Sequence, residues 1–149
     1  MKSRFLLTLT LVGLLALTGS ACKPRSSSSD DADTSSYGSS KGFKTIYFDY
    51  DRDAIRSSQV DNVENNVNAM KKNPGTKITL EGHADDRGTN EYNMALGDRR
   101  ARTVFNYMVN VGIERSRLKV ASFGEEQPVC NEASENCWAK NRRVESVKR

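Results

Sequence analysis

The sequence predicts an α/β fold: an α+β two-layer sandwich in the order βαβαβ(α)β, with helices packed on a mixed sheet. Two observations indicate this. Short stretches of alternating apolar residues, typical of strands, are interleaved with two longer stretches whose apolar residues recur every three or four positions, typical of helices. Residues 43–149 are also enough for one compact domain with a single core, and they contain no internal repeat.

The first half of the domain contains a predicted strand, a helix and a second strand. The first strand covers residues 45–48 and precedes a loop rich in acids. The first helix is predicted with Ser57 or Ser58 as its N-cap and a stop at residues 73–75. Its apolar stripe consists of Val60, Val63, Val67 and Met70. The second strand is predicted from Ile78 and Leu80, which alternate with polar residues.

The second half begins with a long predicted helix that starts at about Glu91, and Gly112 suits its C-terminal cap. The expected buried stripe of this helix is Leu96, Val104, Met108 and Val111, with Ala101 and Phe105 beside it. A third strand is expected around residues 118–123 and a short helical turn at residues 133–139. The last strand is predicted from Val144 and Val147.

The N-terminus has the features of an export signal. Lys2 and Arg4 precede an apolar run at residues 5–17, which is too short for a stable membrane-spanning helix, and small residues then lead to Cys22. We therefore expect residues 1–21 to be a lipoprotein signal peptide and Cys22 to be the lipidated residue. The alternative is an ordinary cleaved signal that leaves Cys22 as a free thiol. A glycine stands three positions before Cys22, where lipoprotein signals usually carry a large apolar residue.

The segment that follows, residues 22–42, is rich in Ser and Asp and has almost no apolar side chains. Such a segment buries too little surface to offset the entropy of ordering, so we expect a flexible tether. Lys23 follows the cysteine, and under the sorting rule of enteric bacteria only Asp at that position retains a lipoprotein in the inner membrane. The expected location is therefore the outer membrane, with a lipid anchor and the domain facing the periplasm.

Charge and cysteine content narrow the function classes. The chain has 23 basic and 19 acidic residues, and removing Lys2 and Arg4 with the signal leaves 21 basic residues, a net charge of +2. That charge does not indicate a nucleic-acid partner. Cys130 and Cys137 are expected to form a local disulfide worth about 2–3 kcal/mol, although two free thiols are the alternative. His83 is the single histidine, so we expect no metal site.

The most informative segment is residues 81–101, EGHADDRGTNEYNMALGDRRA. It places acids and arginines at the end of a predicted strand and the start of a predicted helix. The segment resembles the motif block of OmpA-like peptidoglycan-binding domains, most closely that of the peptidoglycan-associated lipoproteins of Gram-negative bacteria. The resemblance runs from about residue 45 to residue 149 and includes a second block at residues 141–144, NRRV.

The resemblance implies binding of diaminopimelate, a stem-peptide residue whose side chain ends in a centre with an ammonium and a carboxylate. The matching family residues that bind it are Asp85 and Arg100. Asp85 lies just after the second strand and Arg100 lies in the following helix, so the two side chains are able to face each other across a groove. The guanidinium then holds the ligand carboxylate with two hydrogen bonds, and Asp85 accepts from the ammonium.

The resemblance implies further residues for the same peptidoglycan-binding site. Asp51 matches a family aspartate in the loop after the first strand, and the backbone near Tyr50 and Asp51 is expected to line the pocket together with Leu96. Asn93 matches the motif asparagine and either braces the loop or touches the ligand. Arg142 and Arg143 are expected to brace the site from the last strand.

Each site residue also has a simpler interpretation that involves no ligand. Asp85 would cap a helix, Arg100 would pair on the surface with Asp98 or Glu81, and Asp51 would be one more solvated acid. His83 is expected to be a structural residue bonded to the backbone. Trp138 and Tyr92 are most simply partly buried packing residues.

The resemblance implies an outer-membrane lipoprotein of the Tol-Pal system that links the membrane to the cell wall for envelope integrity and for constriction during cell division. TolB is then expected to compete with peptidoglycan for an overlapping face, and TolA is a further candidate partner. No cofactor and no catalytic residue are expected. Two alternatives remain open: a cell-wall hydrolase or amidase built on Glu81, His83 and Asp85, and an envelope module that binds only proteins.

Overall fold

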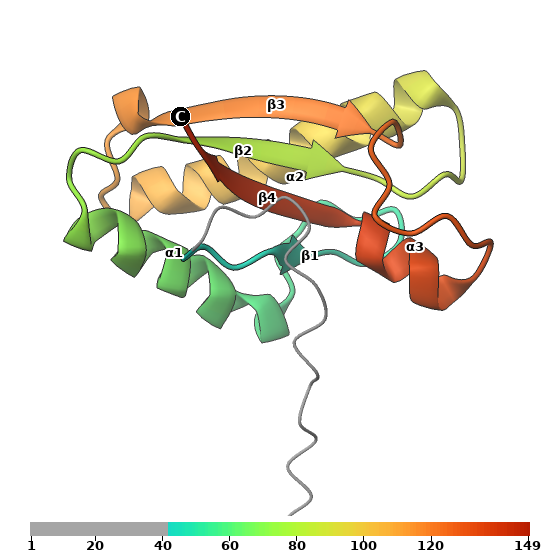
Figure 1. Cartoon of the computed structure of the whole chain (residues 1–149), viewed down its shortest axis with the longest axis horizontal. Helices are drawn as coiled ribbons and strands as arrows, with labels where there is room; N and C mark the ends of the chain where they lie inside the picture. Colours follow the sequence, from blue (N-terminus) through green and yellow to red (C-terminus); the bar gives the residue numbers. More distant parts are fainter. Residues whose placement is uncertain (1–41) are drawn as a thin grey trace, which may run out of the picture. The chain divides into compact units, whose positions relative to one another are not determined.

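The computed structural model describes residues 42–149 (Figure 1). The predicted signal peptide, the lipidation site at Cys22 and all but the last residue of the predicted tether lie outside this range. The described residues form the predicted α+β fold, in which the strand order of the sheet is β1-β4-β2-β3. Along the chain, the elements are β1 (Ile46–Tyr47), α1 (Val60–Lys72), β2 (Ile78–His83), α2 (Asn90–Asn110), β3 (Leu118–Gly124), α3 (Glu135–Asn141) and β4 (Arg143–Lys148).

The sheet is mixed because β2 pairs in parallel with β3 and antiparallel with β4, while β1 pairs antiparallel with β4. In the register, Leu80 lies beside Ser146 on one side and Val120 on the other. Side chains alternate between the two faces of a strand, so the apolar residues of the four strands point to one face. On that face they form a single core with α1 and α2. Ile46, Leu80 and Val144 of this core are fully buried.

Helix α1 has the predicted stripe, since Val63, Val67 and Met70 are buried. The predicted N-cap is wrong. Ser57 and Ser58 lie in a short 3-10 turn that precedes the helix, and Gln59 at the N-cap makes no side-chain capping bond. Because the helix starts only after this turn, at Val60, both serines lie before its N-cap position.

Helix α2 begins at Asn90, where the side chain of Thr89 accepts a hydrogen bond of 3.2 Å from the backbone N–H of Tyr92. This is an N-cap of the usual kind. The predicted stripe of α2 is correct at Leu96, Val104 and Met108, and Phe105 beside it is half-buried. Val111 is wrong, because it lies beyond the last helical residue and is exposed. Gly112 then adopts a positive φ of 96°, a conformation that favours glycine at the end of a helix.

The approach of α2 to β2 depends on two glycines that face each other. A Cβ on Gly82 would lie 1.9 Å from the carbonyl oxygen of Gly97, and a Cβ on Gly97 would lie 2.4 Å from Oγ of Ser122. Backbone therefore packs directly against backbone at this crossing. The close contact holds the end of β2 beside the first half of α2, which are the two elements on which the predicted site depends.

The segment between β3 and β4 forms the predicted short helix, α3, at one end of the sheet (Figure 1). Cys130 and Cys137 are joined in a disulfide, with their Cα atoms 5.2 Å apart. The side chain of Asn141 holds the same loop, because its Oδ1 accepts from the N–H of Val129 and of Cys130. Over the described range, no helix is both long enough and apolar enough to cross a membrane.

Candidate functional site

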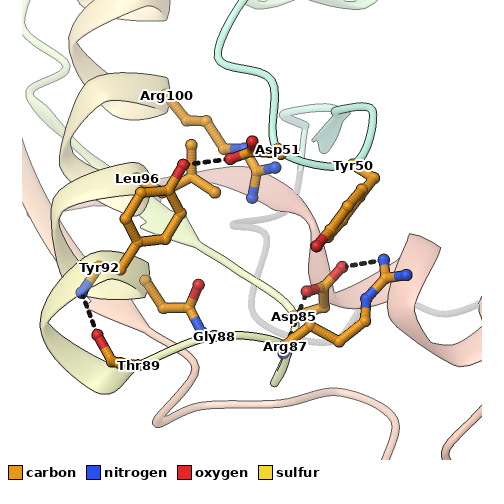
Figure 2. Close-up of a pocket in the computed structure, with 10 residues that line it drawn as sticks. Tyr50, Asp51, Asp85, Arg87, Gly88, Thr89, Tyr92, Leu96 and Arg100 are labelled. Carbon is orange, nitrogen blue, oxygen red and sulfur yellow. Dashed lines mark hydrogen bonds and ion pairs between the residues drawn. The ribbon is translucent and has the colours of Figure 1, made fainter.

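A pocket of about 450 Å³ lies where the loop after β1, the loop after β2 and the first half of α2 meet (Figure 2). Ten residues line it: Tyr50, Asp51, Asp85, Arg87, Gly88, Thr89, Tyr92, Asn93, Leu96 and Arg100. All six residues predicted to bind peptidoglycan belong to this set. The structure thus brings the predicted residues together, and their binding of a ligand stays a prediction.

Asp85 presents a nearly buried carboxylate to this pocket. Its Oδ2 accepts hydrogen bonds from Arg87 Nη2 at 2.7 Å and from Arg142 Nη1 at 3.1 Å. Its Oδ1 accepts one longer bond, 3.3 Å, from the backbone N–H of Arg87. Burial raises the pKa of Asp85, but the bonds from Arg87 and Arg142 outweigh burial and hold the pKa below its ordinary value. Asp85 is therefore a charged acid and not the cap of α2, which is Thr89.

Arg100 is fully buried, so the surface pair with Asp98 or Glu81 is wrong; Asp98 pairs with Arg102 instead. Its guanidinium donates to three backbone carbonyls: Nε to Arg52 at 2.8 Å, Nη1 to His83 at 2.8 Å, and Nη2 to Asp49 at 3.0 Å. Burial lowers the pKa of Arg100 to about 10, so the group stays charged at neutral pH. An arginine has five N–H donors, and the bonds made to described residues use three of them.

Asp51 is held in place by its backbone and by a neighbour. It is the one described non-glycine residue with a positive φ, 52°, a conformation that aspartate tolerates better than most residues. Its carboxylate accepts a hydrogen bond from the hydroxyl of Tyr92 (Figure 2). Asp51 is therefore a positioned acid rather than a freely solvated one. Tyr92, expected to be partly buried, is exposed at the rim of the pocket.

Two lining residues are buried and uncharged: Asn93 contributes an amide and Leu96 an apolar side chain. The Asn93 side chain donates to a carboxylate oxygen of Glu125 in the segment after β3. Of the two roles left open for Asn93, the structure thus contains the bracing contact. Gly88 has a positive φ of 116° and turns the chain between Asp85 and the start of α2.

The arginines of the second motif block have different environments. Arg142 is buried and donates to Asp85, to the carbonyl of Phe48 and to Glu135, so it braces the pocket as expected. Arg143 instead pairs with Glu145 on β4, and both side chains are buried. The expectation that both arginines brace the site is therefore correct for Arg142, while Arg143 makes its ion pair elsewhere on the sheet.

His83 is buried and stacks on Phe123 with ring centroids 5.5 Å apart. Burial, together with the charge of Arg143, lowers its pKa to about 3, so the imidazole is neutral. The expected hydrogen bond to backbone is wrong, since neither ring nitrogen has a partner in the described part of the chain. Within residues 42–149 no group of His, Cys, Asp and Glu side chains is arranged to hold a metal ion.

The sequence analysis did not identify four of the residues that line the pocket: Arg87, Gly88, Thr89 and Tyr92. A local signal existed for Thr89, which is a capping residue directly before a helical pattern. Arg87 and Tyr92 had no such signal. Arg87 bonds to Asp85 nearby, but its contact with Trp138 and the bond of Tyr92 to Asp51 join residues far apart in the sequence, which only the fold brings together.

Comparison with known proteins is consistent with this geometry. The OmpA family model matches residues 47–142, which is more than half of the chain. This chain belongs to the OmpA family. The matched range contains all six predicted site residues of the OmpA domain and the residues that brace Asp85.

Several relatives are peptidoglycan-associated lipoproteins by name. The one from Pseudomonas putida is 42% identical over 105 residues, covering 70% of this chain and 63% of that protein. The one from Mesorhizobium japonicum is 37% identical over 148 residues, covering 91% of this chain and 87% of that protein. This chain thus spans less than two thirds of the length of the Pseudomonas putida protein and most of the Mesorhizobium japonicum protein.

Solved structures show the same fold. The peptidoglycan-associated lipoprotein from Burkholderia pseudomallei superposes with a TM-score of 0.69 at 32% identity, over 71% of this chain and 90% of that chain. The C-terminal domain of Helicobacter pylori MotB has a TM-score of 0.67 at 24% identity, over 72% of this chain and 85% of that chain. The second likeness concerns the fold alone.

Proposed function

We propose that this chain is a lipoprotein of the cell envelope whose OmpA domain binds peptidoglycan non-covalently through diaminopimelate. The observation that carries the proposal is the meeting of Asp85 and Arg100, an acid and a base with little or no exposure, in one pocket. The names of the relatives support it, because the proteins similar to this chain are called peptidoglycan-associated lipoproteins.

The pocket has the chemistry that a zwitterionic ligand requires. The ligand carboxylate accepts from the two N–H groups that Arg100 retains. The ligand ammonium donates to Asp85 Oδ1, which accepts one long bond from the backbone N–H of Arg87. Asp51 adds a second carboxylate on the lining, and Leu96 offers an apolar wall to the methylene groups of the ligand. Each charge-assisted bond contributes about 1.5–3 kcal/mol.

The anchor and the partners belong to the same proposal. Acyl chains at Cys22 hold the protein in the outer membrane, and residues 22–42 allow the domain to reach the cell wall. More than one acyl chain is needed for stable attachment, which diacylation at Cys22 supplies. In the Tol-Pal system the protein connects the outer membrane to the wall during constriction, with TolB and TolA as partners.

The proposed protein is a binder and not an enzyme. A hydrolase built on His83 requires an imidazole that reaches the substrate and exchanges protons near neutral pH. His83 is about 1% exposed and its pKa is about 3, which favours a structural role. Incubation of the purified protein with sacculi tests this: we expect binding without release of soluble fragments, and fragment release would identify an enzyme.

Co-sedimentation with sacculi tests binding directly. We expect the protein to pellet with diaminopimelate-type sacculi and to stay in solution with lysine-type sacculi, because lysine lacks the second carboxylate. Asp85→Asn and Arg100→Lys are expected to weaken pelleting about tenfold or more. Asp85→Asn removes the charge that accepts from the ligand ammonium, and Arg100→Lys keeps a charge but removes the two-point contact with the ligand carboxylate. Asp61→Asn, at an exposed position on α1, is the matched control and is expected to pellet like wild type.

Both variants must be shown to fold, because Arg100 also holds the loop after β1 and the end of β2 through three backbone carbonyls. Circular dichroism and thermal unfolding serve this purpose. Equal pelleting of wild type and folded variants would contradict the proposal and favour a module that binds only proteins.

The relation to TolB is tested by competition. If TolB covers an overlapping face, a soluble diaminopimelate-containing muropeptide lowers the apparent affinity for TolB, and TolB lowers the affinity for the muropeptide by the same factor. Binding of both without mutual weakening would show separate sites.

A further inference from the structure

The Arg87 guanidinium lies over two aromatic rings, Tyr50 and Trp138, in a cluster beside the pocket that we call the stack. The carbon at the centre of its guanidinium is 3.9 Å from the ring centroid of Tyr50 and 4.2 Å from the ring centroid of Trp138. The stack joins three segments that are far apart in the sequence: the loop after β1, the loop after β2, and α3. Stacking on two aromatic faces is favourable for a guanidinium, which is planar and weakly hydrated.

The stacked guanidinium is also a direct partner of Asp85. Its Nη2 donates to Asp85 Oδ2 at 2.7 Å and lies 3.6 Å from a carboxylate oxygen of Glu135. In Figure 2 the guanidinium lies beyond Asp85 as seen from Leu96, so the carboxylate is held from behind while its other oxygen stays on the pocket side. Arg142 donates to the same Oδ2 and to Glu135.

Helix α3 is fixed independently of this stack. The disulfide links Cys137, the neighbour of Trp138, to Cys130, and the side chain of Ser134 caps the helix by accepting from the N–H of Cys137. The side chain of Asn141 accepts from the backbone N–H of Cys130 and donates to its carbonyl, which ties the last turn of α3 to Cys130. Trp138 is thus presented to Arg87 from a braced element.

We infer that Trp138 is a positioning residue of the pocket: it holds Arg87 against Tyr50, and Arg87 in turn fixes the carboxylate of Asp85 for the ligand. The inference rests on the proposed function, since it assumes that Asp85 accepts from a ligand ammonium. The inference goes beyond that function because α3 and its disulfide lie outside the pocket lining and would still affect the binding affinity.

The physical reason is the freedom of an arginine side chain. Arg87 is about 30% exposed, and without Trp138 one of its two walls is gone, so the side chain gains rotamers that do not reach Asp85. Asp85 then keeps Arg142 as its close partner and Arg100 as a nearby charge. With fewer bonds to its charged form, the carboxylate is less fixed and its pKa rises toward the ordinary value.

The test uses the full chain in detergent and a soluble muropeptide that contains diaminopimelate. Trp138→Leu is expected to bind about three- to tenfold more weakly than wild type, in the range of a lost cation–π contact. Trp138→Phe keeps an aromatic wall and is expected to restore most of the affinity. Phe105→Leu is the matched control, because it removes an aromatic ring that also lies under an arginine, Arg115, at 5.4 Å on another part of the domain. This variant is expected to bind with wild-type affinity.

A second readout, the pKa of Asp85 measured by carboxyl NMR in the ligand-free protein, separates this inference from the proposed function. We expect a higher pKa in Trp138→Leu than in wild type and Trp138→Phe. An unchanged pKa overturns the inference, whatever the affinity. If wild type does not bind the muropeptide, the proposed function fails, and the pKa still decides whether Trp138 positions Asp85.

Arg87→Met provides an independent check if Trp138→Leu unfolds. It removes the guanidinium and leaves both rings, and it is expected to weaken binding and to raise the pKa of Asp85. In a double-mutant cycle, Trp138→Leu is expected to add little to Arg87→Met, because both changes remove the same contact. Additive losses in affinity would show that Trp138 acts by another route and would overturn the inference.

Discussion

Among single residues, Asp85 connects stability to pH. Its pKa in the folded protein is below the ordinary value, because the bonds from Arg87 and Arg142 outweigh the effect of burial. The folded state therefore binds fewer protons than the unfolded state in the acid range. The stabilisation is fully present above the unfolded pKa of about 4 and is lost as the pH falls through the folded pKa.

Asp85→Asn is thus expected to lower the free energy of unfolding by about 2–3 kcal/mol at neutral pH, since two arginines lose a charged acceptor. The difference from wild type shrinks as the pH falls below about 4. Urea unfolding of both proteins across this range measures it. A difference that stays constant down to about pH 2 would show that the carboxylate is not held in its charged form.

Asp51 combines a backbone role with a side-chain role, and substitutions separate the two. Its φ of 52° costs about 1–2 kcal/mol for a residue with a Cβ and nothing comparable for glycine. We expect Asp51→Gly to be more stable than Asp51→Ala by about 1 kcal/mol, while both lose the carboxylate and bind muropeptide equally weakly. Thermal unfolding and a binding titration measure the two effects. Wild-type binding by Asp51→Gly would remove Asp51 from the ligand contacts.

The crossing of α2 over β2 holds the pocket residues of α2, Leu96 and Arg100, on a helix whose backbone packs directly against the end of β2. Because a Cβ at Gly82 or Gly97 would overlap backbone or Ser122, Gly97→Ala is expected to destabilise the domain by about 3 kcal/mol or more and to displace Arg100. Gly75→Ala is the matched control, since no atom lies within 4 Å of its Cβ position and its φ is not positive. Chemical unfolding of both variants measures this. A Gly97→Ala loss no larger than that of Gly75→Ala would show that the helix shifts freely.

Local patterns predicted most of these elements, and contacts between distant segments account for the errors. The apolar stripes of α1 and α2 were predictable because a helix buries residues at a fixed spacing. The cap of α1 was not, since a 3-10 turn replaces it. Val111 has an apolar side chain at the right spacing, but the helix ends at Asn110, so the side chain of Val111 does not continue the buried stripe. The arrangement of Trp138 on Arg87 depends on α3 folding back on the loop after β2, for which the sequence has no local pattern.

For the whole molecule, the candidate site is also a point at which the fold is held together. Arg100, buried on α2, donates to the carbonyls of Asp49 and Arg52 in the loop after β1 and of His83 at the end of β2. Sequence alone placed Asp85 and Arg100 in one site through a family resemblance, but it did not indicate that Arg100 is fully buried. A single guanidinium thus joins the loop after β1 to the end of β2.

Ligand binding is consequently expected to stabilise the whole domain, because the pocket exists only when the three segments are folded together. A ligand that binds only the folded state adds about 2.7 kcal/mol of stability at a concentration a hundred times its Kd. For a domain of this size, that corresponds to a rise in Tm of roughly 10 °C or more.

Differential scanning calorimetry with diaminopimelate-containing muropeptide measures the shift. Lysine-containing muropeptide is the control and is expected to leave Tm unchanged, because it offers no second carboxylate to Arg100. Equal shifts with both ligands would place the recognised group elsewhere on the muropeptide, and no shift with either, at concentrations that saturate sacculus binding, would mean that the bound surface also persists in the unfolded chain.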